Sequence, residues 1–428
     1  TQVRRSSIEV GGIIQENTVW NADTVKVTAD VQIMDQIKLS ISPGVQVEFQ
    51  GYYQLQVDGC LEASGSPEAF IRFTSANPEL FQPDSSLTGC WQGIRYSGTS
   101  AVNDSSLFQY CVFECSKTLD EYDPGGVFGL FNFSKIAIRN CIFQDNLGTY
   151  GGVLSCRYNS NPIFCNNLVY GNYALISGSV LYSSYSYPKV INNTIINNQM
   201  LNEEFFWATA AIHNFISKPL IWNNIIRDNY TAYFEYFQLL ENKQYYTVCN
   251  NIEDAEEGNG NIDLDPLFLL AGSDPYSLLP VSPCIDSGTL HPEYSSTTDL
   301  KGNPRLFGAE VDMGAYEWQE TSWGNDVWSV GNSFTNYPNP FNPSGAGRSL
   351  MTTISFVTQV QAEKTEISIF NLKGQQVKEL VNEVLEAGSH TVTWDGKDEN
   401  GKSAPSGIYF CRMKSGDFVQ NRKMMLIK

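Results

Sequence analysis

The densest group of carboxylates in the chain lies in the segment EDAEEGNGNIDLD at 253–265, which holds six carboxylates in thirteen residues. Calcium ions in proteins are bound by carboxylate and carbonyl oxygens, so this loop has the right chemistry for one. Asp263 and Asp265 are the candidate ligands. The spacing does not match the twelve-residue EF-hand loop. Calcium is the one cofactor that the sequence suggests.

Carboxylates are scarce in the middle of the chain. Residues 125–235 contain five of them: Asp145, Glu203, Glu204, Asp228 and Glu235. Glycosidases need two carboxylates about 5–10 Å apart, and Arg139 and Arg157 are the nearby candidate bases for a lyase. No nucleophile elbow, P-loop or dinucleotide-binding motif is present. The sequence therefore favours a non-enzymatic protein, with a polysaccharide lyase or glycoside hydrolase as the alternative.

Aromatic residues are more suggestive of binding, because 13% of the chain is aromatic. The candidates for binding or assembly fall into three clusters: Tyr182, Tyr185 and Tyr187; Phe205, Phe206 and Trp207; and Tyr233 with Tyr236. Exposed aromatic rings offer a stacking surface for sugars or a dry patch for another subunit.

Charge is unevenly distributed along the chain, whose net charge is -19. Residues 333–428 hold 11 Lys and Arg against 9 Asp and Glu, so that the remainder carries a charge of -21. An acidic body repels nucleic acid and anionic membranes. No run of about 20 apolar residues could span a bilayer. The chain starts at Thr1 without a signal peptide, and we expect a mature chain whose export signal has been removed.

A short motif recurs through the middle of the chain: NCIFQDN at 140–146, NNLVYGN at 166–172, NNTIINN at 192–198 and NNIIRDN at 223–229. A repeat of 26–31 residues that holds short strands and no helical pattern predicts one coil of a solenoid per repeat. Stacked coils pair their strands in parallel about 4.8 Å apart and bury a common core. Asn tolerates left-handed backbone and can bond to Asn in the next coil.

The upstream segments SISPGVQVEF, LQVDGCLEASG, IRFTSAN and WQGIRY alternate apolar and polar residues. They resemble the opening coils of bacterial right-handed parallel β-helix proteins of the pectate-lyase-like superfamily, over roughly residues 18–260. The resemblance implies an all-β fold, with a right-handed parallel β-helix over 1–260. It implies no activity, because this scaffold also carries many non-enzymatic surface proteins.

The pattern changes at residue 261. NIDLDPLF, SPCIDSG, DLKGNPR and VDMGAYE follow in order within 261–317. This series resembles the choice-of-anchor segment that follows β-helices in exported bacterial proteins. Its polar positions are Asp263, Asp265, Asp286, Arg305 and Asp312. They fit either a calcium or ligand site or an ion-paired cap over the last coil, and we favour the cap.

Residues 318–336 are expected to form a linker to a C-terminal module at 337–428. YPNPFNPS opens this module, EISIFNLKGQQVKEL and GSHTVTWDGKDENGKSAPSGIYFCRM follow, and RKMMLIK closes it. It resembles the type A sorting domain of the type IX secretion system and the flagellar hook-cap immunoglobulin-like domain, so we expect a small immunoglobulin-like β-sandwich. The resemblance implies the sorting positions Tyr337, Pro338, Pro340, Phe341, Gly374, Gly407, Tyr409, Lys423 and Lys428.

The chain has ten cysteines without a CxxC pair and three histidines far apart, which argues against a zinc site. Cys60 and Cys90 each follow Gly one coil apart and form the candidate disulfide, whereas Cys111 and Cys141 are expected to be stacked inward thiols.

Together these observations predict a secreted, non-enzymatic structural or adhesive protein on the outer surface of a Gram-negative bacterium. The expected partners are the type IX secretion machinery, cell-surface glycans, and other copies of the chain in a surface fibre or layer. No nucleic-acid partner is expected.

Overall fold

The computed structural model describes residues 6–120, 122, 125–201, 210–231, 246–253, 258–269, 274–291, 298–319, 334–337, 341, 343, 351–358, 363–385, 388–416 and 418–426. Apart from the short 3-10 turn Pro78–Leu80, the regular structure of these residues is β-strand. The chain divides into two compact units, one of residues 1–266 with 283–318 and one of residues 267–282 with 319–428.

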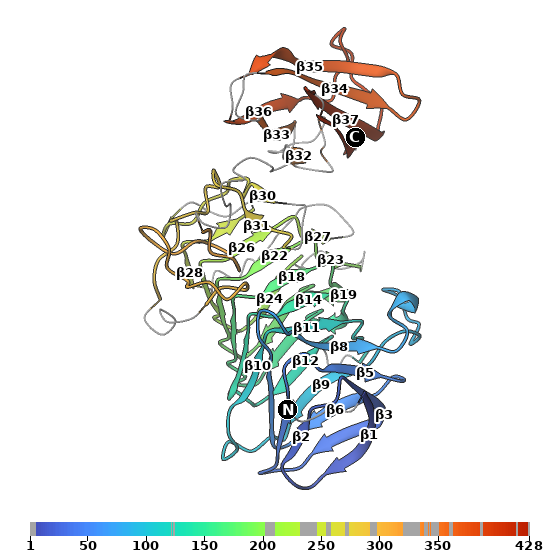
Figure 1. Cartoon of the computed structure of the whole chain (residues 1–428), viewed down its shortest axis with the longest axis vertical. Helices are drawn as coiled ribbons and strands as arrows, with labels where there is room; N and C mark the ends of the chain where they lie inside the picture. Colours follow the sequence, from blue (N-terminus) through green and yellow to red (C-terminus); the bar gives the residue numbers. More distant parts are fainter. Residues whose placement is uncertain are drawn as a thin grey trace. The chain divides into compact units, whose positions relative to one another are not determined.

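The first unit is a parallel β-helix, as the repeats predicted (Figure 1). Each coil contributes one strand to each of three faces. Face 1 is formed by β6 (Gln54–Val57), β9 (Gly93–Ser97), β12 (Phe128–Phe131), β16 (Leu154–Arg157), β20 (Leu181–Ser184) and β24 (Ile212–Phe215). Face 2 is formed by β2 (Thr18–Trp20), β4 (Lys38–Ile41), β7 (Cys60–Ser64), β10 (Ser106–Gln109), β13 (Ile136–Arg139), β17 (Ile163–Cys165), β21 (Lys189–Ile191), β25 (Leu220–Trp222) and β28 (Tyr246–Val248).

Face 3 is formed by β5 (Gln46–Phe49), β8 (Ile71–Ser75), β11 (Cys111–Glu114), β14 (Ile142–Gln144), β18 (Leu168–Tyr170), β22 (Thr194–Ile196), β26 (Ile225–Arg227) and β29 (Asn251–Ile252). The long strand β3 (Thr24–Ile33) joins faces 1 and 3, and β1 (Ser7–Ile14) pairs with it. A flanking sheet follows face 3 in four coils: β15 (Leu147–Tyr150), β19 (Tyr173–Ser177), β23 (Gln199–Met200) and β27 (Tyr230–Thr231).

The core is built from columns of equivalent residues. Phe73, Phe113 and Phe143 occupy matching positions in β8, β11 and β14, and their rings stack with centroids 4.8 and 5.0 Å apart. Alternate residues of each strand point inward, so a strict register places like residues on top of one another. Cys111 and Cys141 are fully buried in this core.

Two buried asparagine ladders fix the corners on either side of face 3. One runs through Asn146, Asn172, Asn198 and Asn229, and the other through Asn167, Asn193, Asn224 and Asn250. Each side-chain amide donates to the Oδ1 of the next Asn, as from Asn172 to Asn198 at 2.9 Å, and that oxygen also accepts the Asn172 backbone N–H. Buried polar groups must be paired, so each Asn satisfies a neighbouring coil and locks its register.

The second unit contains a small antiparallel sandwich, consistent with an immunoglobulin-like fold. One sheet orders β32 (Phe334–Tyr337), β33 (Thr352–Thr358) and β36 (Gly388–Trp394), and the other orders β35 (Gln376–Leu385), β34 (Glu363–Asn371), β37 (Gly407–Ser415) and β38 (Phe418–Leu426). Trp394 is fully buried between Phe341 and Tyr409, with ring centroids 5.3 and 5.1 Å away. A separate two-stranded pair, β30 (Phe268–Leu269) and β31 (Ser277–Leu278), also belongs to this unit.

Among the described residues, no helix is long and apolar enough to cross a membrane.

Candidate functional site

The segment that we call the strap, described over residues 283–291 and 298–318, does not simply cover the last coil as the sequence predicted. It runs back along the corner between faces 2 and 3. Outward asparagines of successive coils donate their side-chain amides to strap carbonyls: Asn140 to Thr298 at 2.9 Å, Asn192 to Asp312 at 3.0 Å and Asn223 to Thr289 at 2.9 Å. These asparagines form a column of their own, which lies directly before the ladder of Asn167, Asn193, Asn224 and Asn250 in sequence and docks the strap.

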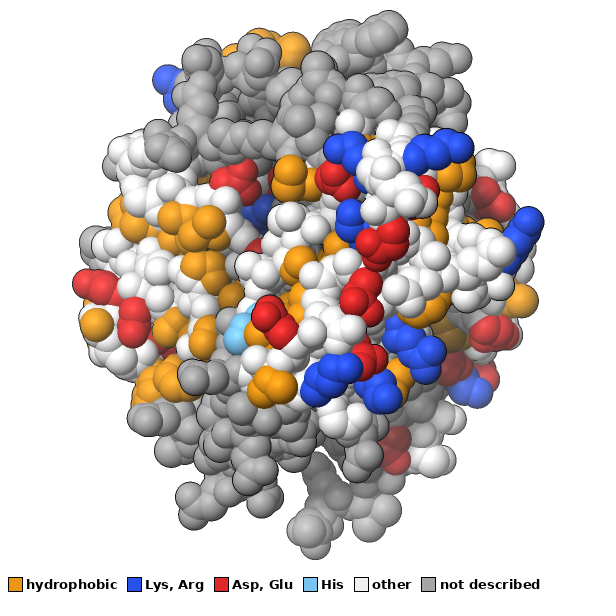
Figure 2. Space-filling view, turned by 90° about the horizontal axis from the view of Figure 1, so that it is seen from above, with side chains coloured by type: hydrophobic (Ala, Val, Ile, Leu, Met, Phe, Trp, Pro, Cys, Tyr) orange, Lys and Arg blue, Asp and Glu red, His pale blue; other side chains and the backbone are white. Residues whose placement is uncertain are grey.

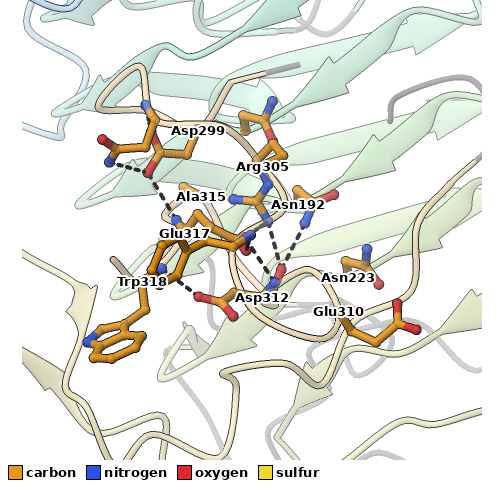
Figure 3. A network of polar contacts seen from close by, with 12 residues as sticks. Asn192, Asn223, Asp299, Arg305, Glu310, Asp312, Ala315, Glu317 and Trp318 are labelled. Atoms are coloured by element: carbon orange, nitrogen blue, oxygen red, sulfur yellow. Dashed lines mark hydrogen bonds and ion pairs between the residues drawn. The ribbon is translucent and has the colours of Figure 1, made fainter. Parts of the chain in front are cut away.

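Three buried carboxylates hold the strap in its irregular path (Figure 3). Asp299 accepts the backbone N–H groups of Asn303 and Glu317, at 2.7 and 3.0 Å. Asp312 accepts that of Trp318 at 2.6 Å, and Glu317 in turn accepts that of Asp312 at 3.0 Å. The carboxylates thus replace the strand ladder that this segment lacks. Because these carboxylates accept hydrogen bonds from the strap's own backbone, they favour the structural interpretation of these positions over a calcium or ligand site.

One buried cation compensates this acidic cluster. The Arg305 guanidinium donates to the carbonyl of Asp312 at 2.7 Å and lies 3.7 Å from the Glu317 carboxylate. Burial raises the pKa of Glu317 to about 8 and that of Asp312 to about 6, although Arg305 opposes both shifts. The strap consequently binds protons more tightly in the folded protein than in the unfolded chain.

The candidate calcium ligands are placed at the end of the β-helix. Asp263 accepts a hydrogen bond of 2.6 Å from the buried guanidinium of Arg227, which also donates to Asn251 at 2.9 Å. Asp265 is half-buried nearby. Across the described residues, no three His, Cys, Asp or Glu side chains converge as a metal site would require. Calcium binding by Asp263 and Asp265 stays a prediction.

The candidate disulfide between Cys60 and Cys90 is wrong, because all ten cysteines are free thiols. Cys60 begins strand β7 of face 2, and its thiol lies 3.6 Å from the carbonyl of Ser105. Cys90 precedes Trp91, which bridges to Ser116 beyond face 3. The two cysteines sit at different corners of their coils, so a one-coil spacing in sequence does not stack them.

A different corner, between faces 1 and 2, presents large apolar side chains to solvent. We call it the aromatic corner. It consists of Phe131, Tyr158, Tyr185, Tyr187, Phe215 and Ile216, each between 41% and 50% exposed. The rings follow one another from coil to coil, with centroids 5.1 Å apart for Phe131 and Tyr158 and 5.8 Å apart for Tyr158 and Tyr185.

Register explains why these side chains align. Phe131, Arg157, Ser184 and Phe215 are paired positions at the ends of β12, β16, β20 and β24. The next residues form a second column of Asn132, Tyr158, Tyr185 and Ile216, all with left-handed φ of 49–55°. Left-handed backbone costs a residue with a Cβ about 1–2 kcal/mol, and Asn bears it more easily. Three of four coils nevertheless carry a bulky residue there.

Part of this corner was predicted from the sequence. Tyr185 and Tyr187 are exposed members of it, whereas Tyr182 lies half-buried on the outward side of face 1. Phe131, Tyr158, Phe215 and Ile216 were missed. Their signal is a large apolar residue at the last position of β12, β16, β20 or β24 or directly after it, visible once the repeats are aligned on those strands instead of on the Asn motif. Five residues lie outside the described part of the chain: Phe205, Phe206, Trp207, Tyr233 and Tyr236.

Ser177, at the end of β19 in the flanking sheet, and His213, in β24 of face 1, form a nucleophile–base contact. The Ser177 hydroxyl lies 2.6 Å from Nδ1 of His213, and burial lowers the pKa of His213 to about 4. Both side chains are buried, so a substrate could not reach the hydroxyl without movement. No described strand of faces 1 or 2 between residues 125 and 231 carries a carboxylate to orient this histidine. The pair therefore gives the enzyme alternative little support.

The sorting positions fall on several parts of the sandwich. Phe341 and Tyr409 are core residues, and the Tyr409 hydroxyl donates to the carbonyl of Pro405 at 2.7 Å. Gly374 turns the chain between β34 and β35 with φ of 75°, and Gly407 begins β37. Tyr337 of β32 pairs with Thr353 of β33, and Lys423 of β38 pairs with Phe410 of β37. Pro338, Pro340 and Lys428 lie outside the described residues.

Comparison with known proteins bears mainly on the C-terminal module. Residues 347–417 match the family model of the FlgD Ig-like domain. A solved structure of PorZ, an essential bacterial surface component of the type-IX secretion system of Porphyromonas gingivalis, is 16% identical over 27% of this chain, with a TM-score of 0.17. The matched region covers 13% of the PorZ chain. No curated protein matches the sequence.

Proposed function

We propose that this protein is an exported, non-enzymatic adhesive protein of the bacterial outer surface, and that its aromatic corner binds glycans. The observation that carries the proposal is the row of large apolar side chains exposed in four consecutive coils. The β-helix does not need these side chains for its core, which already contains an unbroken set of buried residues. Exposed apolar rows of this kind mark binding surfaces.

The scaffold gives such a surface a fixed geometry. Coils stack about 4.8 Å apart, and the asparagine ladders hold their register. The backbone positions that carry the rings are therefore fixed before a ligand arrives, which reduces the entropy lost on binding. Tyr and Phe faces stack against the apolar face of a sugar ring, and the Tyr hydroxyls add hydrogen bonds at the edge.

The test is affinity electrophoresis of the full chain in gels that contain soluble glycans, followed by titration calorimetry. Tyr158→Ala and Tyr185→Ala should each weaken binding about 2- to 12-fold, the range for one aromatic contact. Tyr122→Ala is the matched control, because Tyr122 is 86% exposed and stands away from the corner. Equal affinity of all four proteins, or no retardation by any glycan, would refute the proposal.

We also propose that residues 337–428 act as a type IX sorting and attachment module. The match to an Ig-like domain and the ordered motifs of the sequence support this assignment. Opposite charges lie close together on the module, as in the pairs Lys364–Glu366 and Lys397–Asp395, and Figure 2 shows basic and acidic side chains side by side on one face. A surface of mixed sign suits contact with a protein partner better than with a polyanion.

Export is tested in a bacterium that has the type IX system. A chain truncated after residue 333 should remain in the periplasm, whereas the full chain should reach the cell surface. A variant with Tyr122→Ala serves as the control for handling. If the truncated chain reaches the cell surface, the sorting role is refuted, and the proposal of glycan binding is unaffected.

Self-assembly is the remaining expectation, and the same corner could serve it. Negative-stain electron microscopy of the purified chain distinguishes self-assembly from glycan binding. Dispersed particles that bind glycan support the adhesive function. Filaments that disappear in Tyr185→Ala would instead make the corner an interface between copies.

A further inference from the structure

The aromatic corner differs from the rest of its unit in charge. Its four turns have the sequences FNFSK at 131–135, RYNSNP at 157–162, SYSYPK at 184–189 and FISKP at 215–219. They contain four cations, Lys135, Arg157, Lys189 and Lys218, and no Asp or Glu. The surrounding chain is strongly acidic, because residues 1–332 carry a net charge of -21. A cationic stripe in an acidic body is therefore a local feature.

The cations are interleaved with the rings. The Arg157 guanidinium lies over the Phe131 ring, 5.7 Å from its centroid. Lys189 pairs with Leu220 across the coils, which places Lys218 at the position that corresponds to Tyr187. Lys218 is exposed, and Lys189 is half-exposed. Each coil thus offers a stacking surface with a positive charge beside it.

The strands of faces 1 and 2 on either side of the corner add no negative charge to this stripe. The described strands β12, β16, β20 and β24 of face 1 and β13, β17, β21 and β25 of face 2 contain no Asp or Glu. The stripe ends towards the N-terminus at the preceding turn, where Lys135 donates to the carbonyl of Asn103 at 3.0 Å and Asp104 is exposed. It therefore spans four coils.

We propose that the ligand of the aromatic corner is an anionic polysaccharide, one that carries carboxylate or sulfate groups along its chain, and that it lies across the coils. This inference rests on the proposed glycan binding. Each coil contributes one cation, at differing positions of its turn, and the coils lie about 4.8 Å apart. This arrangement suits a polymer with roughly one anionic group per sugar ring. Sugar rings stack on Phe131, Tyr158, Tyr185 and Phe215, while the anionic groups meet the cations.

Single-stranded nucleic acid also combines stacking with negative charge. The observations favour a polysaccharide, because the net charge of -21 on residues 1–332 repels a polyanion of high charge density outside the corner. Salt screens exposed charges that lie more than about 8 Å apart at physiological ionic strength, so a ligand that touches only the corner is tolerated. A nucleic-acid ligand is accordingly an outcome that the experiment must be able to report.

The experiment measures affinity of the full chain for three probes: polygalacturonate, a neutral β-glucan and a single-stranded oligonucleotide, each at low and at physiological salt. The expected result is tighter binding of polygalacturonate than of the other two, with affinity falling as salt rises. Lys218→Gln and the double variant Arg157→Gln with Lys218→Gln should lower that affinity about 1.5- to 5-fold and about 2- to 30-fold. Binding of the neutral glucan should be unaffected.

The matched control is Lys373→Gln with Lys402→Gln, which removes two exposed charges from the C-terminal module. Binding of the neutral glucan as tight as that of polygalacturonate, lost in Tyr185→Ala, would overturn the anionic ligand but leave glycan binding standing. Preference for the oligonucleotide would overturn it in favour of nucleic acid. Binding of no probe would refute both proposals. A loss of affinity as large in the control as in the corner variants would show a general charge effect and also overturn it.

Discussion

The left-handed residues of the aromatic corner allow a direct test of whether this corner was selected for folding or for binding. Ile216 has φ of 49° and is 50% exposed. Its left-handed backbone costs about 1–2 kcal/mol relative to a residue that tolerates it. Burial of half an Ile side chain returns about 0.8–1.5 kcal/mol. Replacement by Asn removes both contributions, so Ile216→Asn should change the free energy of unfolding by only about -0.5 to +1 kcal/mol.

Two variants isolate the backbone contribution. Ile216→Ala removes the same burial but lacks the short polar side chain that hydrogen-bonds locally in left-handed backbone, and it should be about 1 kcal/mol less stable than Ile216→Asn. Ile13→Asn makes the same substitution in strand β1, where Ile13 is 58% exposed and extended. It should destabilise by about 1–2 kcal/mol through lost burial and β-propensity.

The assay is urea unfolding followed by circular dichroism, with the midpoint and slope fitted separately for the β-helix transition. If Ile216→Asn loses as much stability as Ile216→Ala, the left-handed corner is not strained and its residue choice follows from folding. If Ile216→Asn keeps stability but loses glycan affinity, the bulky side chain serves binding at the expense of stability.

Three further outcomes follow from the structure. The pKa values of Glu317 and Asp312, raised to about 8 and about 6, exceed those of the unfolded chain near 4. The contribution of these two protonated carboxyl groups to the free energy of unfolding is present at low pH and is lost as the pH rises from about 4 to 8. Urea midpoints should therefore fall over this range, and they should fall less in Glu317→Gln. Asn193→Ala should destabilise by about 2–5 kcal/mol, because it orphans buried partners on both sides of the ladder, whereas Asn161→Ala on the surface should cost under about 1 kcal/mol. Mass spectrometry after alkylation of the unfolded chain should count ten reactive thiols with or without prior reduction; a difference of two would restore a disulfide.

The chain's repeats determined most of the architecture. Short strands recur every 26–31 residues with Asn at fixed offsets, and such a segment can bury its apolar face only by stacking on its neighbours. The same reasoning placed Cys111 and Cys141 in the core, where the structure has them. Alternation and turn residues predicted the antiparallel sandwich at the C-terminus.

Sequence could not decide which corner of a coil a residue occupies when the turn lengths vary. Cys60 and Cys90 share a local context and a one-coil spacing, yet they lie at different corners and remain free. Nor does sequence show whether an aromatic residue points inward: Tyr182 and Tyr185 are three positions apart, and the first is half-buried while the second is exposed. A single extra residue in a turn reverses the face that a strand residue occupies.

The strap, too, combines positions that the sequence predicts with contacts that only the tertiary structure determines. Arg305 and Asp312 were recognisable in sequence as polar positions of a closing segment, whereas Asp299 and Glu317 were not. The three carboxylates accept backbone N–H groups whose positions are set by the path of the chain. The aromatic corner likewise exists only because β12, β16, β20 and β24 hold a common register. Residue types and their periods fixed the coil and its core, because those depend on local pattern. The sites depended on which turns meet across coils, and long-range register decides that.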